Sequence, residues 1–206
     1  LMMDGWLPHT HEHYWKKYGN RLEKIGESFS GGTTGLVVPQ YVDIKSIEEL
    51  NNHVNDFGGE IIGIGSGAGI HKNTLKAIKE YNLKYKQITS SDPAMLAALK
   101  RAYNKKDNIV ITGWKPHPKW AEFELKYLED PKEIYPTDVC AIVSRKGFVK
   151  ENPVVGKFFM NFNLKESQLY SLMDIIKKAD NPKDAANDWY NKHKALVEIW
   201  MPEEMK

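Results

Sequence analysis

Two tryptophans lie in the same short pattern at widely separated points of the chain. The segments are Asp4-Gly5-Trp6-Leu7-Pro8 and Thr112-Gly113-Trp114-Lys115-Pro116-His117. In each, the tryptophan falls at the end of a predicted strand, and the proline behind it prevents the strand from continuing. Ligands of α/β sheets bind outside the carboxyl ends of the strands, so both indoles are predicted to face a cleft. Two facing indoles would hold a methylated ammonium group by cation–π attraction, worth about 0.5–2 kcal/mol per ring. Ordinary packing in a core or lid is the alternative interpretation.

A glycine-rich segment, Gly63 to Gly69, follows a predicted strand and opens a predicted helix. Gly63 to Ala68 satisfies the G-x-G-x-x-A variant of the dinucleotide fingerprint. Amides of such a turn can cradle an anion at the helix N-terminus. The strand lies mid-chain, however, and the acid expected about 20 residues later has no clear candidate beyond Glu80. A tight strand-to-helix turn is the simpler explanation, and a nucleotide-dependent α/β enzyme with this phosphate loop stays the alternative function.

Histidines at positions 9, 11 and 13 form a third group, with His9 and His13 on one helical face. They could bind zinc, but the H-E-x-x-H pattern is absent and no carboxylate at i+3 or i+4 completes a ligand set. A solvated helix entrance with structural hydrogen bonds is favoured. Cys140 has no basic neighbour in its strand, and no G-x-S-x-G motif exists. We therefore predict no metal site, no cofactor, no catalytic residue and no enzymatic activity.

Composition narrows the class further. Of the 206 residues, 41% are hydrophobic and 27% charged, which is typical of a folded globular protein. The net charge of +2 offers no basic patch for nucleic acid, so none is expected as a partner. The apolar runs are far shorter than the ~20 residues that span a bilayer. The single cysteine excludes an internal disulfide.

The middle of the chain alternates short strands with helices, which predicts a largely parallel sheet covered by helices. The expected strands are 35–38, 60–63, 85–89, 108–112 and 141–143. The expected helices are 9–25, 46–57 (with a Ser46/Glu49 capping box), 70–81, 92–103, 153–162, 166–179 and 183–200. Ser28 to Gly35 is rich in Gly, Ser and Thr and is predicted to be a flexible or crossing segment. We expect residues 1–34 to form part of lobe 1, 35–138 an inserted α/β lobe 2, and 139–206 the return to lobe 1.

Several segments together resemble the glycine betaine-binding proteins of osmoprotectant ABC importers. They occur in the same order over essentially the whole chain: Met3 to Pro8, His11 to Tyr18, Gly35 to Pro39, Ile61 to Ile70, Thr112 to His117, Leu125 to Pro131 and Ser144 to Gly147. The resemblance implies a two-lobed periplasmic-binding-protein fold of type II-like architecture, with parallel or mixed sheets and flanking helices. It also implies that Trp6 and Trp114 are cage walls, one from each lobe, and that His117 joins them in binding the ligand. The ligand would be a quaternary-ammonium osmolyte such as glycine betaine.

This sequence departs from the family pattern at two places. Family members usually carry a third cage tryptophan in the C-terminal segment, where this chain reads Asn161-Phe162-Asn163-Leu164-Lys165. Phe162 is the candidate substitute wall, while Asn163 or Leu164 takes the tryptophan's place. After the Pro-His pair an aromatic residue is usual, whereas here Pro118 follows and the next aromatic is Trp120. Trp120 is a further candidate for the cleft, with core packing as the alternative.

The resemblance implies a membrane permease of an ABC importer as partner and an extracytoplasmic location, and it leaves a lipid anchor on the full-length protein open. Family members also carry a preceding segment that supplies the first strands of one lobe and ligand-binding amides. Lobe 1 is therefore expected to be incomplete in this chain, which would be completed by subunit exchange, a second chain or a longer protein.

Overall fold

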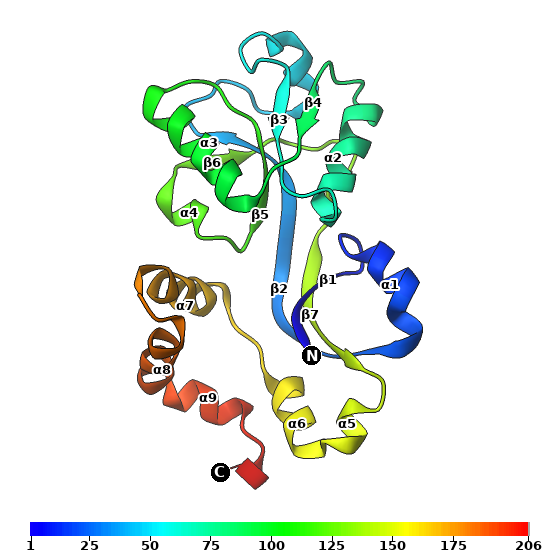
Figure 1. Cartoon of the computed structure of the whole chain (residues 1–206), viewed down its shortest axis with the longest axis vertical. Coiled ribbons are helices and arrows are strands. Elements are labelled where there is room, and N and C mark those ends of the chain that lie inside the picture. The colour runs from blue at the N-terminus through cyan, green and yellow to red at the C-terminus, as the bar shows by residue number, and fades with distance from the viewer. Residues whose placement is uncertain (206) are drawn as a thin grey trace. The chain divides into compact units, whose positions relative to one another are not determined.

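The computed structural model describes residues 1–205, which divide into two compact units. Unit 1 comprises Leu1–Gly32, Pro116–Pro118 and Asp138–Lys206, of which Lys206 is not described. Unit 2 comprises Thr33–Lys115 and Lys119–Thr137. The long strand β2 (Leu22–Pro39) contributes residues to both units (Figure 1). Each unit is described by itself below.

The sheet of unit 1 is antiparallel and is built around β7. This strand, Asp138–Arg145, pairs on one side with β1 (Met2–Leu7) and on the other with the first half of β2. Trp6 lies opposite Cys140, and Phe29 lies opposite the same cysteine on the other flank. Cys140 is buried, and burial raises the pKa of its thiol to about 12. The thiol is therefore an unreactive part of the core.

The helical part of unit 1 packs around its own apolar cluster. Trp189, Val197, Trp200 and Leu164 are its buried members. Successive helices α7, α8 and α9 contact one another (Figure 1). The helices of this unit are α1 (Glu12–Tyr18), α5 (Phe148–Glu151), α6 (Pro153–Asn161), α7 (Glu166–Lys178), α8 (Pro182–Lys192) and α9 (Lys194–Trp200), with 3₁₀ turns at Gly19–Arg21 and Glu203–Met205.

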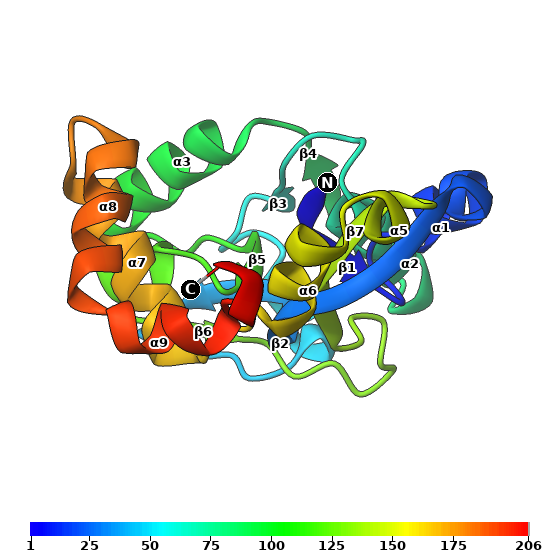
Figure 2. The same cartoon turned by 90° about the horizontal axis from the view of Figure 1, so that it is seen from below.

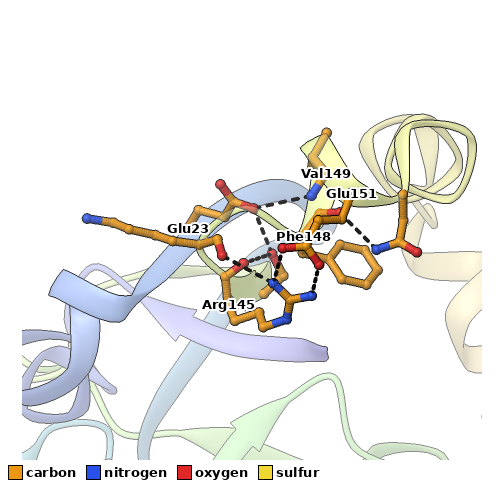
Figure 3. Close-up of polar contacts among 8 residues, drawn as sticks. Glu23, Arg145, Phe148, Val149 and Glu151 are labelled. Atoms are coloured by element: carbon orange, nitrogen blue, oxygen red, sulfur yellow. Dashed lines mark hydrogen bonds and ion pairs between the residues drawn. The ribbon is translucent and has the colours of Figure 1, made fainter.

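A polar network joins the start of β2 to the end of β7 and to α5 (Figure 3). Glu23 accepts hydrogen bonds from the Ser144 hydroxyl at 3.2 Å and from the Val149 amide at 3.5 Å. The two terminal nitrogens of the Arg145 guanidinium each donate to one oxygen of the Glu151 carboxylate, and the bond from Nη1 to Oε1 is 2.9 Å long. These side chains are more than half exposed, so the pair contributes little to stability.

The sheet of unit 2 mixes parallel and antiparallel pairs. The second half of β2 runs antiparallel to both β5 and β6, whereas β3 runs parallel to β4 and β5. Its strand order is therefore β6-β2-β5-β3-β4. The bounds are Glu60–Ile62 for β3, Lys86–Ile88 for β4, Ile111–Lys115 for β5 and Leu125–Tyr127 for β6. The largely parallel sheet expected from the alternating pattern is thus a mixed one.

Two helices cover opposite faces of this sheet. Helix α2 (Gly69–Glu80) packs with Leu36 and Val38, while α3 (Asp92–Lys105) packs with Val37. Successive side chains of β2 point to opposite faces of the sheet and pack into two separate apolar clusters, as expected of a strand that is buried on both faces. Figures 1 and 2 both place α2 and α3 on either side of β3 and β5. The short α4 (Lys119–Glu122) completes the unit.

Helices 70–81 and 92–103 are confirmed within one or two residues of their predicted ends. The capping box is also confirmed, since the Ser46 amide donates to Glu49 at 3.0 Å, but the helix behind it is a 3₁₀ helix over Ile47–His53. The final predicted helix, 183–200, is two helices broken at His193.

One expectation for the first forty residues was wrong. The helix predicted over 9–25 is limited to α1, because the chain enters β2 at Leu22. The segment Ser28 to Gly35, predicted to be flexible or crossing, lies inside that same strand, and the chain passes from unit 1 to unit 2 within it. Its glycines are accommodated because neighbouring aromatic rings pack where side chains would otherwise stand: Trp6 lies over Gly32 and Tyr127 over Gly35.

Candidate functional site

The Trp6 indole is packed against backbone. It lies near the end of β1, half-buried, with its six-membered ring directly over Gly32 of β2. A β-carbon built at Gly32 would approach Cζ3 of the indole to 2.9 Å, which is closer than real contacts allow. The absence of a side chain at position 32 therefore determines where this ring can lie.

The backbone of Trp6 is held by the histidine segment that follows it. The Trp6 amide donates to Nδ1 of His11 at 3.0 Å, and the His11 amide donates back to the Trp6 carbonyl at 2.8 Å. Nδ1 must be unprotonated to accept that bond. Burial lowers the pKa of His11, against the opposing charges of Asp4 and Asp138, which favours the neutral ring that the bond requires.

Asp138 fixes the same turn from the opposite side. Its two carboxylate oxygens accept the amides of His9 at 2.7 Å and of Thr10 at 2.9 Å. Asp138 is itself buried, at 2% exposure, so these are charge-assisted bonds shielded from water. We call Trp6, Gly32, Asp138 and the turn His9–His11 the Trp6 corner.

The Trp114 indole is supported differently, by side chains. Trp114 lies opposite Thr34 in the β2–β5 pair and is half-buried. The indole of Trp120 donates to the Trp114 carbonyl at 2.8 Å. The Nζ atom of Lys119 lies 3.9 Å from the centroid of the Trp114 ring. We call Trp114, Lys119 and Trp120 the Trp114 corner.

Lys119 is almost completely enclosed, at 1% exposure. Burial lowers the pKa of its amine to about 7, with the charge of Asp92 acting in the opposite direction. By contrast, Lys115 is only half-buried, and its Nζ lies 4.4 Å from the centroid of the Trp120 ring. Trp120 also packs on Tyr127, with ring centroids 4.8 Å apart.

The remaining predicted ligand residues lie in unit 1. His117 is buried, at 8% exposure. Phe162 caps α6 and packs on Trp200, with ring centroids 4.5 Å apart. Leu164 is buried, and its amide donates to the Ser28 carbonyl at 2.9 Å. The structure thus brings Trp114 and Trp120 together in unit 2, and holds Trp6, His117 and Phe162 in unit 1.

The glycine-rich segment and the histidine group, the two other candidate sites of the sequence, both lie where a strand leads into a helix. Gly63 to Gly69 does connect β3 to α2, and Gly63 is held on both sides: its amide donates to the Ile88 carbonyl at 2.9 Å and its carbonyl accepts from the Ser90 hydroxyl at 2.6 Å. His9 and His11 hold the turn after Trp6. Within residues 1–205, no three His, Cys, Asp or Glu side chains are grouped so that they could hold a metal ion.

Sequence reasoning missed two residues of these corners, because neither Asp138 nor Lys119 was singled out. His11 was expected to make structural hydrogen bonds rather than to bind zinc, but its bonds to Trp6 were not foreseen. Asp138 contacts His9 and Thr10, which lie 129 and 128 positions earlier in the chain, so no local spacing predicts these contacts. Lys119 carried one available signal, which is its place between two tryptophans in the segment Trp114 to Trp120.

Comparison with known proteins decides the family. Residues 1–192 match the family described as the substrate-binding domain of the ABC-type glycine betaine transport system. The chain belongs to this family. The glycine betaine/carnitine transport binding protein GbuC of Listeria monocytogenes is 32% identical over 177 residues, covering 84% of this chain. The chain spans 57% of the length of that relative.

Solved structures of the family share the fold. Lactococcal OpuAC, in its closed-liganded conformation with glycine betaine, matches 97% of this chain and 79% of its own, with 35% identity and a TM-score of 0.90. The glycine betaine/L-proline-binding protein ProX of Borrelia burgdorferi matches 98% of this chain and 78% of its own, with 29% identity and a TM-score of 0.92. The predicted α/β fold of periplasmic-binding-protein type, with a mixed sheet and flanking helices, is confirmed.

The homologues are substrate-binding proteins of ABC transporters, which are not enzymes, and this supports the binding interpretation over the nucleotide-dependent enzyme. Substrate-binding proteins of ABC importers are extracytoplasmic. Among the helices in the described part of the chain, none has the length and apolar character needed to cross a membrane.

Proposed function

We propose that this protein captures a quaternary-ammonium osmolyte, glycine betaine or a close analogue, and delivers it to the permease of an ABC importer. The observation that carries the proposal is the pair of half-buried indoles, Trp6 and Trp114, each near a strand end in a chain of the glycine betaine-binding family. The trimethylammonium group sits against both rings, where loss of water strengthens the cation–π attraction.

In this proposal the two units act as the two lobes. Unit 1 corresponds to the lobe expected over 1–34 and 139–206, and unit 2 to the lobe expected over 35–138, except that residues 33–34 fall in unit 2 and residues 116–118 and 138 in unit 1. Each lobe therefore contributes one tryptophan. Contact with both rings makes the ligand stabilise the closed arrangement of the lobes, and the permease recognises that arrangement. No bond is made or broken.

The other ligand candidates take supporting roles in the proposal. His117, two residues before the buried Lys119 and three after Trp114, contacts the ligand beside Trp114. Phe162 offers a third apolar wall, and Trp120 supports Trp114 through its bond to the Trp114 carbonyl. A lipid anchor on the full-length protein stays a prediction of the family resemblance.

Isothermal titration calorimetry tests the proposal directly. Glycine betaine, proline betaine, carnitine and choline are titrated into the protein, with NAD and ATP as comparison ligands. We expect heat of binding with at least one quaternary amine and none with the nucleotides. No binding of any quaternary amine at millimolar concentration would overturn the proposal.

A further inference from the structure

Lys119 occupies an unusual place for a lysine. It is the largest of the side chains that are fully buried, and its amine lies 3.9 Å from the centroid of the Trp114 ring. Its Cε lies within 3.6 Å of a β-carbon built at Gly113, the residue just before that tryptophan. The lysine stem therefore runs beneath β5, and the amine meets one face of the indole. Trp114 itself is only half-buried, which leaves other parts of its surface open to a ligand.

Two opposing influences determine whether this amine is charged. Burial favours the neutral form and holds the pKa at about 7, while Asp92 at the start of α3 favours the charged form. Charged or titratable groups on the neighbouring segments include Lys115 on β5, Glu122 on α4 and His117 between them, while α3 carries Lys100, Arg101, Tyr103 and Lys105. Lys115 lies over Trp120 and not over Trp114. Both protonation states of Lys119 are therefore populated near neutral pH.

We propose that Lys119 sets the affinity of the Trp114 ring for a quaternary ammonium ligand. The inference rests on the proposed function and deepens it. An aromatic face attracts cations through its quadrupole. A charged Lys119 itself makes a cation–π interaction with one face of the Trp114 ring. It also repels a second cation that approaches the same ring. Two like charges roughly 8 Å apart in a partly buried site weaken binding about tenfold. Neutral Lys119 removes the repulsion and leaves the full attraction to the ligand.

The proposal makes binding depend on pH in a defined direction. A bound cation disfavours the charged lysine, so binding releases protons. Below the pKa of Lys119 in the complex, the amine is charged with or without ligand and affinity is lowest. Affinity then rises with pH and levels off above the pKa in the free protein. A tenfold effect corresponds to a release of about half a proton per ligand near the middle of this range.

Calorimetry of glycine betaine binding between pH 5.5 and 8, in buffers of different ionisation enthalpy, tests this without any variant. We expect the affinity of the unaltered protein to rise about tenfold with pH and protons to be released. Constant affinity with no proton release overturns the inference while leaving the proposed function intact. Failure to bind any quaternary amine at any pH overturns the proposed function instead.

Two substitutions assign the effect to Lys119. Lys119→Met has similar length and no charge, and we expect it to bind at all pH values as tightly as the unaltered protein does at pH 8, with no proton release. Lys119→Arg keeps a permanent charge and is expected to bind weakly throughout. Lys115→Met is the matched control and should keep the original pH profile. A Lys119→Met protein that retains the pH profile would assign the titration to another group and overturn the inference.

Discussion

Trp6 and Trp114 occupy equivalent places in their units, each half-buried near the end of a strand and followed two residues later by proline. Their supports share nothing. At the Trp6 corner, backbone amides and a buried carboxylate hold the turn, and the ring rests on the bare backbone of Gly32. At the Trp114 corner, a buried lysine and a second indole support the ring and its carbonyl.

The difference has a functional consequence. The Asp138 carboxylate and the His11 ring of the Trp6 corner bond to the backbone, so substitutions of these residues should change stability and ring position together. Lys119 at the Trp114 corner places a titratable charge against the ring, so substitutions there can change affinity while the fold is kept. The Trp6 corner therefore holds its ring in a fixed position, whereas the charge of Lys119 at the Trp114 corner can change the affinity of its ring for the ligand.

The largest effect is expected for Asp138→Ala at the Trp6 corner. It leaves the amides of His9 and Thr10 without their buried, charge-assisted partners, and we expect the free energy of unfolding to fall by roughly 3 kcal/mol. Chemical denaturation measures the loss. Asp174→Ala is the control, because Asp174 is half-exposed and its pair with Lys178 is worth only a few tenths of a kcal/mol. Equal losses for the two variants would contradict the role given to Asp138.

Removing either ring should reduce affinity by a similar amount. Trp6→Ala and Trp114→Ala each delete one cation–π wall, and each is expected to weaken glycine betaine binding about 30-fold, or roughly 2 kcal/mol. Calorimetry measures both. Tyr190→Ala removes an aromatic ring that is 42% exposed and should leave affinity within about twofold. Unchanged affinity for one tryptophan variant would remove that residue from the cage.

Gly32→Ala should distinguish the two corners. The added methyl would meet the Trp6 indole at 2.9 Å, so the ring must move, at a cost of about 1–2 kcal/mol. We expect weaker betaine binding and a changed Trp6 environment by tryptophan fluorescence. Gly65→Ala is the matched control, since a β-carbon there meets nothing within 4 Å. If Gly32→Ala and Gly65→Ala bind alike, backbone packing does not position Trp6.

The smallest effect concerns His11 and appears only in acid. Its pKa is lowered in the folded protein below the ordinary 6.5, so protonation favours the unfolded chain. The stability that it contributes is complete above about pH 6.5 and is lost as pH falls through the lowered pKa. His11→Asn keeps an acceptor for the Trp6 amide but cannot titrate. The free energy of unfolding of this variant should fall less between pH 7 and pH 5, and an identical fall would exclude His11 as the titrating group.

Local signals predicted the parts of the fold that local interactions form. The helices 70–81 and 92–103 and the capping box at Ser46 were foreseen because propensity and capping act within a few residues. Of strand β2, only the part over 35–38 was predicted, because glycine, serine and threonine over 28–35 indicate a flexible or crossing segment. Its strand conformation comes from pairing with Asp138–Arg145 and Ile111–Lys115, more than 70 positions along the chain.

The same distinction applies to the site. Both tryptophans could be proposed from the sequence, because the Gly-Trp-x-Pro pattern marks a strand end and the indole suggests a cationic ligand. The residues that support the two tryptophans could not be predicted from the sequence. The Asp138 contacts depend on tertiary structure, and the burial of Lys119 depends on how α3, α4 and β5 pack. A motif can therefore identify a ring without revealing the charge placed against it.

The most direct test of the central claim compares glycine betaine with 3,3-dimethylbutanoate, which has the same shape but carries carbon in place of the charged nitrogen. Calorimetric titration of both ligands at pH 8 isolates the contribution of the positive charge. If Trp6 and Trp114 hold a cation by their aromatic faces, glycine betaine should bind at least about 30-fold more tightly. Equal affinities would show that the site selects shape alone and would contradict the cation–π cage.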